Sequence, residues 1–163
     1  MNSIVNVISD LTQKFNSFVD SRPTIFNELR WMQIRNVANG KCLTDPGRGA
    51  QLIVIDCVAG YNASQTWRIL PHVEGWYSIH SMNMNFIDVN EDRIDNGSKI
   101  QSWERNLSNV QRYQIFPSGS NFIISKAYAN KVFDVDPATM MVRVWDANSS
   151  DNQKFKFIAR YDN

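Results

Sequence analysis

Cysteine and histidine, the side chains most often used for metal binding and nucleophilic catalysis, are scarce in this chain. It contains two cysteines, Cys42 and Cys57, and two histidines, His72 and His80. Two cysteines cannot form a four-thiolate zinc site, and the sequence has neither an HExxH nor a CxxC motif. The counts allow a Ser-His-Asp or Cys-His arrangement, but no sequence signature supports one. We therefore expect no enzyme activity, no metal site and no cofactor.

Aromatic residues offer a different chemistry. They make up 12% of the 163 residues, with five tryptophans. This surplus predicts either a core with many aromatic positions or rings on which a ligand stacks. The formal net charge is +1 without a basic run, which excludes nucleic acid from the expected partners because phosphate binding needs concentrated positive charge. No apolar stretch reaches the roughly 18 residues of a membrane span.

The elements that must position such residues come from an internal repeat that begins at Arg30. Each of three units opens with a strand-like stretch, at residues 31–34, 76–79 and 121–124, and the closing isoleucines are 45 residues apart. Each unit ends in Gln-x-aromatic: Gln65-Thr66-Trp67, Gln111-Arg112-Tyr113 and Gln153-Lys154-Phe155. Two landmarks that recur three times in the same order indicate three structural copies.

Within each unit the local signals favour strands. Residues 99–103 and 142–145 alternate in polarity or are rich in β-branched and aromatic residues, and Asn39-Gly40 and Asn96-Gly97 predict tight turns. About four strands per unit give roughly twelve in all. Three four-stranded copies close most economically into an all-β β-trefoil, a barrel capped by hairpins, with the aromatic of each Gln-x-aromatic in the core. A β-sandwich with an accidental threefold pattern is the alternative.

These three in-phase motifs resemble the ricin B-chain type of lectin domain, over roughly residues 30–160. The first copy keeps the Trp of the family's Gln-x-Trp, at Trp67, whereas the others have Tyr113 and Phe155. The resemblance implies a carbohydrate-binding, non-catalytic domain at residues 30–163. Its expected partners are glycans that end in galactose or N-acetylgalactosamine.

A sugar pocket of this kind combines three groups. A carboxylate accepts hydrogen bonds from neighbouring hydroxyls, an aromatic ring covers the apolar face of the pyranose, and an amide supplies a donor and an acceptor. The third unit matches the family's positions best. The candidate residues there are Asp134, Trp145, Asn152 and Gln153. In the second unit they are Asp88, Gln101, Trp103 and Asn109, where Asn109 is one position out of register because Val110 precedes Gln111.

The first unit lacks all three groups. Thr44, Ile55 and Ser64 occupy the matching positions, and the adjacent Asp45 should point to the opposite face of its strand. We therefore expect sugar sites in the second and third units only. The alternatives are that Asp88 and Asp134 stabilise turns and that Trp103 and Trp145 pack in the core. Core roles would be expected in all three units alike.

The resemblance also implies a disulfide between Cys42 and Cys57, which are 15 residues apart across the hairpin of the first unit. The alternative is two reduced cysteines in the core. A disulfide would imply an extracellular or secreted protein, although the N-terminus does not have the pattern of a secretory signal.

Residues 1–29 differ from the repeats. Their apolar residues recur at helical spacing, and Ser3 and Pro23 suit the start and the end of a helix. The apolar stripe consists of Ile4, Ile8, Leu11, Phe15 and Phe18. We expect a helical extension that either packs on its own domain or docks on a protein partner, a second copy included.

Two other functions fit a β-trefoil. The chain could be the receptor-binding subunit of a larger toxin or adhesin, with the N-terminal stripe docked on its partner. It could also be a β-trefoil protease inhibitor, but that class needs a protruding inhibitory loop, and nothing in the sequence marks one.

Overall fold

A computed structural model describes residues 30–126 and 130–160, and the regular structure of this part of the chain consists of short strands joined by loops and single helical turns. The predicted helical extension, residues 1–29, lies outside the described residues. Twelve strands occur in the described part: β1 (Trp31–Asn36), β2 (Cys42–Thr44), β3 (Ile53–Ile55), β4 (Trp67–Pro71), β5 (Tyr77–Ser81), β6 (Phe86–Val89), β7 (Ile100–Trp103), β8 (Tyr113–Ser118), β9 (Asn121–Lys126), β10 (Lys131–Val135), β11 (Val142–Asp146) and β12 (Phe155–Arg160).

The helical elements are single 3₁₀ turns between these strands. They are η2 (Ala63–Gln65), η3 (Val73–Gly75), η4 (Asn90–Asp92), η5 (Asn109–Gln111) and η6 (Asp151–Gln153). Three of them, η2, η5 and η6, end on the Gln of a Gln-x-aromatic motif. Among the described residues, no helix has the length and apolar character needed to cross a membrane.

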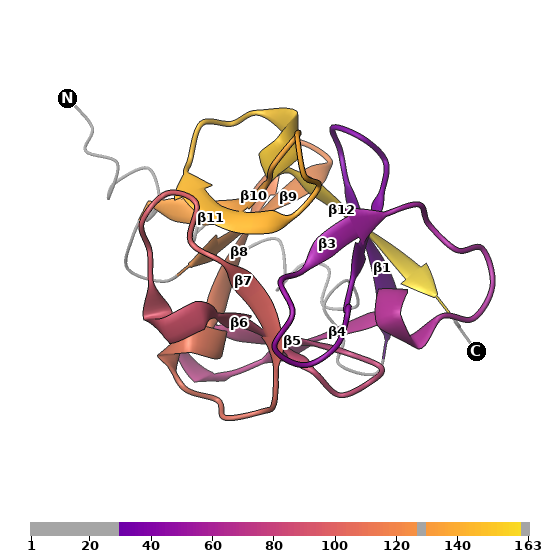
Figure 1. Ribbon diagram of the computed structural model, residues 1–163, viewed down its shortest axis with the longest axis horizontal. Coiled ribbons are helices and arrows are strands. Elements are labelled where there is room, and N and C mark those ends of the chain that lie inside the picture. The colour runs from indigo at the N-terminus through magenta and orange to yellow at the C-terminus, as the bar shows by residue number, and fades with distance from the viewer. Residues whose placement is uncertain (1–29, 127–129, 161–163) are drawn as a thin grey trace.

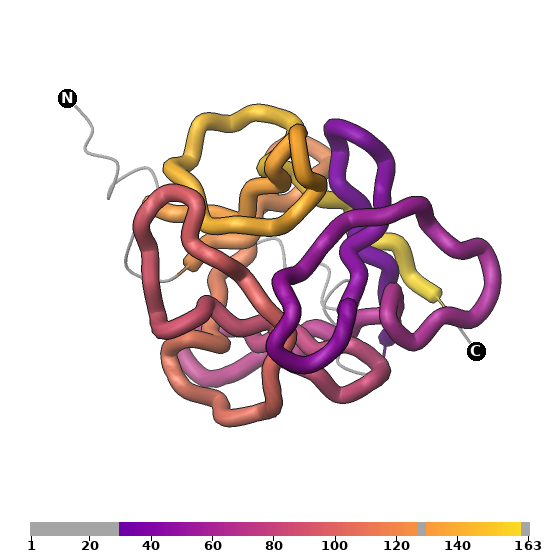
Figure 2. The backbone as a smooth tube through the Cα atoms, in the orientation of Figure 1, coloured from indigo at the N-terminus to yellow at the C-terminus, as the bar shows by residue number. Residues whose placement is uncertain are grey.

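The strands form three lobes of four, which confirms the repeat and the β-trefoil. The first lobe is β1–β4, the second β5–β8 and the third β9–β12, and Figure 1 shows them arranged around a common centre. Antiparallel pairing of β4 with β5 and of β8 with β9 joins successive lobes. The barrel closes where β12 pairs with β1 from Trp31↔Arg160 to Asn36↔Phe155, and Figure 2 shows the two ends of the described chain side by side.

The hairpins β2–β3, β6–β7 and β10–β11 cap the barrel and meet one another. Isolated bridges join Gln51 to Gln101, Ile53 to Met141 and Lys99 to Arg143, so each hairpin touches both of its neighbours. At their junction lie Leu52, Ile100 and Val142, one from each lobe and all fully buried. The backbone N–H of Leu52 donates to Ile100, and that of Val142 donates to Leu52.

The aromatic of each Gln-x-aromatic motif is fully buried in the core, as predicted. The indole Nε1 of Trp67 donates to the carbonyl of Leu43 at 2.9 Å. The hydroxyl of Tyr113 donates to the carbonyl of Ile87, also at 2.9 Å. A buried polar group needs such a partner, and Phe155 in the third lobe has no polar atom to satisfy. The softened motif is therefore compatible with the same core position in every lobe.

A buried carboxylate, Asp45, links the first lobe to the second. Its side chain accepts hydrogen bonds from the Ser81 hydroxyl at 2.6 Å and the Asn85 amide at 2.9 Å, both in the second lobe. It also accepts from the Ser102 hydroxyl at 2.7 Å and the backbone N–H of Gly47 at 2.9 Å. Four donors satisfy a carboxylate that burial would otherwise penalise. The repeat pattern did not reveal this contact between lobes.

The predicted disulfide is present. Cys42, at the start of β2, is bonded to Cys57, which follows β3, and their Cα atoms are 5.0 Å apart. The bond closes a loop around the hairpin of the first lobe.

We expect Asp45→Ala to lower the free energy of unfolding by about 3 kcal/mol or more, because it leaves several buried donors without an acceptor. Urea unfolding measures the change. Asp56→Ala is the matched control: its side chain is 94% exposed and pairs with Lys41, so its removal should cost less than about 0.5 kcal/mol. Equal losses in the two variants would contradict the assigned role of Asp45.

Replacing Cys42 and Cys57 together by Ser should lower the free energy of unfolding by about 3 kcal/mol, the chain-entropy value for a loop of this length. Calorimetry with and without a reductant measures it. The reductant should destabilise the wild-type chain to the level of the double variant and leave that variant unchanged. A wild-type melting temperature that does not respond to the reductant would contradict the prediction.

Candidate functional site

The hairpins of the second and third lobes each bring together an aspartate, the residue opposite it on the next strand, and a tryptophan. Asp88 on β6 lies opposite Gln101 on β7, and Asp134 on β10 lies opposite Arg143 on β11. Trp103 and Trp145 follow these partners by two residues, so each ring projects from the same face of its strand as the partner. Carboxylate, cross-strand partner and ring are thereby brought together in both lobes.

In the second lobe the carboxylate is held by two amides. Gln101 Nε2 donates to Asp88 Oδ1 at 3.0 Å, and Gln111 Nε2 donates to Asp88 Oδ2, also at 3.0 Å. Asp88 is only 3% exposed, so both its position and its orientation are fixed. An ionised carboxylate has about four acceptor sites, and two of them are occupied here. The remaining capacity suits the hydroxyl donors of a ligand.

The Gln of the Gln-x-aromatic motif holds the carboxylate of its lobe in both the second and the third lobe. In the second lobe, Gln111 Nε2 also donates to the carbonyl of Glu104 at 2.7 Å, and Gln111 Oε1 accepts from the backbone N–H groups of Asn106 and Leu107. Gln153 repeats the pattern in the third lobe: it donates to Asp134 Oδ2 at 2.8 Å and to the carbonyl of Asp146 at 2.9 Å. Gln153, a predicted site residue, is therefore a buried positioning residue.

In the third lobe the carboxylate has a cationic partner that the sequence analysis did not identify. Arg143 Nε donates to Asp134 Oδ1 at 2.9 Å, and Arg143 Nη1 lies 3.2 Å from Asp136 Oδ2. The same guanidinium lies over the ring of Trp145, 4.1 Å from its centroid. The backbone N–H of Ala138 and then the charge of Arg143 lower the pKa of Asp136. The spacing from the tryptophan, the same as for Gln101, is the signal that could have revealed Arg143.

Both candidate rings are half-buried and rest against a glycine of the preceding lobe. A Cβ at Gly49 would lie 3.5 Å from Cζ3 of Trp103, and one at Gly97 would lie 3.8 Å from Cζ3 of Trp145. Gly49 donates its backbone N–H to Ser102 at 2.7 Å, and Gly97 donates to Val144 at 2.8 Å, in each case the residue before the Trp. The rings are thus fixed from one side while part of each remains in solvent.

The two predicted amides have other roles in the described structure. Asn152 Nδ2 donates to the carbonyl of Val135 at 3.1 Å, and its Oδ1 accepts from the hydroxyl of Ser150. Asn109 is exposed, and its backbone carbonyl accepts from Lys126 Nζ. Burial lowers the pKa of Lys126. The structure brings Gln101 and the motif Gln residues, rather than Asn109 or Asn152, into contact with the carboxylates.

The first lobe has the same hydrogen bonds from its motif glutamine, but Thr44 takes the place of the aspartate. Gln65 Nε2 donates to Thr44 Oγ1 at 3.2 Å and to the carbonyl of Asp56 at 2.9 Å, as its counterparts do in the other lobes. Thr44 in turn donates to the carbonyl of Cys42. Ile55, at the ring position, is exposed. The three matching positions of this lobe therefore offer neither a carboxylate nor a ring.

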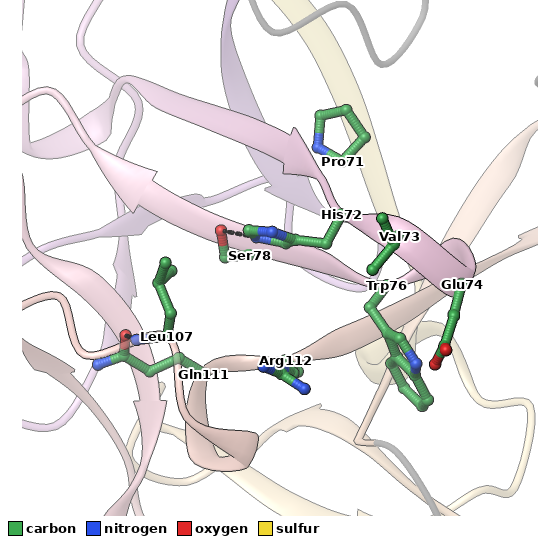
Figure 3. A pocket seen from close by; sticks show the side chains of 9 residues that line it. All are labelled: Pro71, His72, Val73, Glu74, Trp76, Ser78, Leu107, Gln111 and Arg112. Atoms are coloured by element: carbon green, nitrogen blue, oxygen red, sulfur yellow. Dashed lines mark hydrogen bonds between the residues drawn. The ribbon is translucent and has the colours of Figure 1, made fainter.

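A cavity of about 550 Å³ lies elsewhere, at the junction of the first two lobes. It is bounded by the β4–β5 connection on one side and by Leu107, Gln111 and Arg112 on the other. Figure 3 shows the His72 ring turned toward Ser78, with His72 Nε2 and Ser78 Oγ 2.8 Å apart. Burial, and then the charges of Arg112 and Arg105, lower the pKa of His72. None of the four paired Asp and Trp residues lines this cavity.

Within the described ranges, no cluster of three His, Cys, Asp or Glu residues could hold a metal ion. The arrangement in the second and third lobes instead combines hydrogen-bond acceptance by a fixed carboxylate with an adjacent ring surface. That combination suits a neutral, polyhydroxylated ligand with an apolar face.

Comparisons with known proteins agree with this fold. No curated protein sequence matches the chain. The chain is similar to the Rhizoctonia solani agglutinin (19% identity, TM-score 0.69, 80% of this chain and 94% of that chain). It is also similar to the Macrolepiota procera ricin B-like lectin, solved in complex with lactose (14% identity, TM-score 0.67, 78% and 94%). A mosquitocidal holotoxin matches at 16% identity and a TM-score of 0.71 over 80% of this chain, but over only 17% of its own.

The sequence model of the ricin-type β-trefoil lectin domain matches residues 30–155, which is most of the chain and includes all three Gln-x-aromatic glutamines. The chain therefore belongs to the ricin-type β-trefoil lectin domain family and has its carbohydrate-binding fold.

Proposed function

We propose that this protein is a lectin that binds terminal galactose-type sugars through its second and third lobes and catalyses no reaction on them. One observation carries the proposal. A buried carboxylate that retains free acceptor capacity lies on the same hairpin as a half-buried tryptophan in these two lobes, and the first lobe has neither group. A role in core packing alone would not account for that joint presence and joint absence.

The expected sugar class follows from the chemistry of the pair. Asp88 and Asp134 can each accept from two neighbouring hydroxyls, which makes the contact sensitive to their stereochemistry. Trp103 and Trp145 can stack on the apolar face of a pyranose. The relative solved with lactose, a disaccharide that ends in galactose, supports this class.

Binding at two sites of one body has a consequence for affinity. A single shallow sugar site is weak, but two sites that engage clustered glycans gain from effective concentration. The disulfide supports work in an oxidising environment, so we propose an extracellular or secreted protein. We also propose that residues 1–29 dock on a partner chain or on a second copy.

Alanine variants of the three equivalent positions test the assignment of lobes. Asp88→Ala and Asp134→Ala should each weaken binding to their lobe roughly tenfold or more, because a hydrogen bond to a charged group is worth roughly 1.5–3 kcal/mol. Thr44→Ala should leave binding unchanged. A glycan array identifies the preferred sugar, and titration with a monovalent galactoside measures each variant without avidity.

Thr44→Ala is the control. Thr44 contacts the motif glutamine of its lobe as the two aspartates do, but it carries no carboxylate, and its hairpin carries no tryptophan. If Thr44→Ala weakened binding as much as Asp88→Ala, the assignment of sugar sites to lobes would be wrong. If neither aspartate variant changed the binding of the array's preferred sugar, the hairpins would not be the sugar sites.

A further inference from the structure

The second and third lobes differ at one position that touches both groups of the candidate site. Two residues before the tryptophan, the second lobe has Gln101 and the third has Arg143. Both lie opposite the site aspartate in the strand register, and both donate to its Oδ1 atom. The comparison is therefore between a neutral amide and a guanidinium in equivalent places.

At the carboxylate, the guanidinium is the stronger competitor for a ligand's hydroxyls. Arg143 donates a charge-assisted hydrogen bond to Asp134 at 2.9 Å and forms a second ion pair with Asp136 at 3.2 Å. Its side chain is only 22% exposed. A sugar that binds Asp134 must share that carboxylate with an anchored cation, whereas in the second lobe it meets Asp88 held by amides alone.

At the ring, the guanidinium covers part of the indole surface on which a pyranose could stack. Arg143 lies 4.1 Å from the centroid of Trp145, which is a stacking distance. Trp103 also has a cation nearby, Arg48, at 5.0 Å. That side chain comes from the loop of the first lobe, is 55% exposed, and pairs with the exposed Glu104 rather than with Asp88. An exposed pair of this kind is weak, so Arg48 can be displaced at little cost.

We propose that Arg143 is a specificity-determining residue that makes the third lobe a low-affinity site for neutral galactosides, so that the second lobe is the principal site. The inference rests on the proposed lectin function and ranks its two sites. The third lobe has the more complete set of site residues by type, yet Arg143 both binds its carboxylate and lies over its ring.

Tryptophan indole signals distinguish the two lobes in the full chain. In two-dimensional NMR spectra each indole N–H gives its own peak, and Trp103→Phe and Trp145→Phe assign the two that matter. Titration with methyl β-galactoside should shift the Trp103 peak at a concentration on the order of tenfold lower than that needed to shift the Trp145 peak. Equal midpoints for the two peaks, or an earlier shift of Trp145, would overturn the inference.

Reciprocal exchange tests the cause. Arg143→Gln gives the third lobe the side chain that the second lobe already accommodates, and it should bring the Trp145 midpoint down toward that of Trp103. Gln101→Arg should raise the Trp103 midpoint on the order of tenfold. Arg35→Gln removes the same charge from β1, where Arg35 bonds Gln33, and should change neither midpoint.

The outcomes separate this inference from the proposed function. If wild-type protein shows shifts but Arg143→Gln leaves the Trp145 midpoint unchanged, Arg143 does not set the specificity. If the spectrum of Arg143→Gln shows that this variant is not folded, the Gln101→Arg variant, which leaves the third lobe unchanged, tests whether an arginine at this position weakens sugar binding. If no neutral sugar shifts either peak, the proposed lectin function itself is contradicted.

Discussion

The buried glutamine of each Gln-x-aromatic motif is the interaction on which the lobes depend. A primary amide has two donor hydrogens and an oxygen that can accept twice, and in every lobe the glutamine uses them for the same three kinds of contact. It ties down the loop after the third strand, at Asp56 and Val58, at Glu104 and Asn106, and at Asp146 and Asn148. It also reaches the site residue on the second strand. One side chain thereby fixes a hairpin, a loop and a functional position, while the aromatic two residues later anchors the segment in the core.

This constraint explains how the site can contain a buried carboxylate. A charge removed from water is tolerated only when hydrogen bonds replace its hydration. The motif glutamine provides one such bond to Asp88 and to Asp134, and the cross-strand residue provides another. Because these bonds exist without a ligand, the carboxylate is already oriented, and ligand binding would carry no entropy cost for fixing this side chain. The cross-strand donor is the partner of the carboxylate that differs between the two lobes, Gln101 in one and Arg143 in the other.

The sequence predicted the features that repeat. A period of 45 residues, the phase of the three motifs and the short alternating runs were sufficient for the β-trefoil, its twelve strands and the buried aromatics. The family resemblance supplied the disulfide. Features that break the repeat were harder to find, because they depend on contacts between lobes. Asp45 bonds residues 36 to 57 positions away, and Gly49 supports a tryptophan 54 positions further on. Arg143 was missed for a different reason: its spacing from Trp145 matches that of Gln101 from Trp103, but its contact with Asp134 is established only by the pairing of β10 with β11.

The first lobe shows that the frame and the binding groups are separable. Gln65 makes the same loop contacts as Gln111 and Gln153, but it meets the hydroxyl of Thr44 instead of a carboxylate. The lobe folds with the same strand pairing and the same buried aromatic, so the aspartate is not required for the architecture. The lobe fold therefore tolerates the burial of Asp88 and Asp134 but does not require either carboxylate. In a fold built from three equivalent units, single side chains at this position and opposite it can therefore differ from lobe to lobe: Thr44 in the first, a carboxylate held by two amides in the second, and a carboxylate bound by a guanidinium in the third.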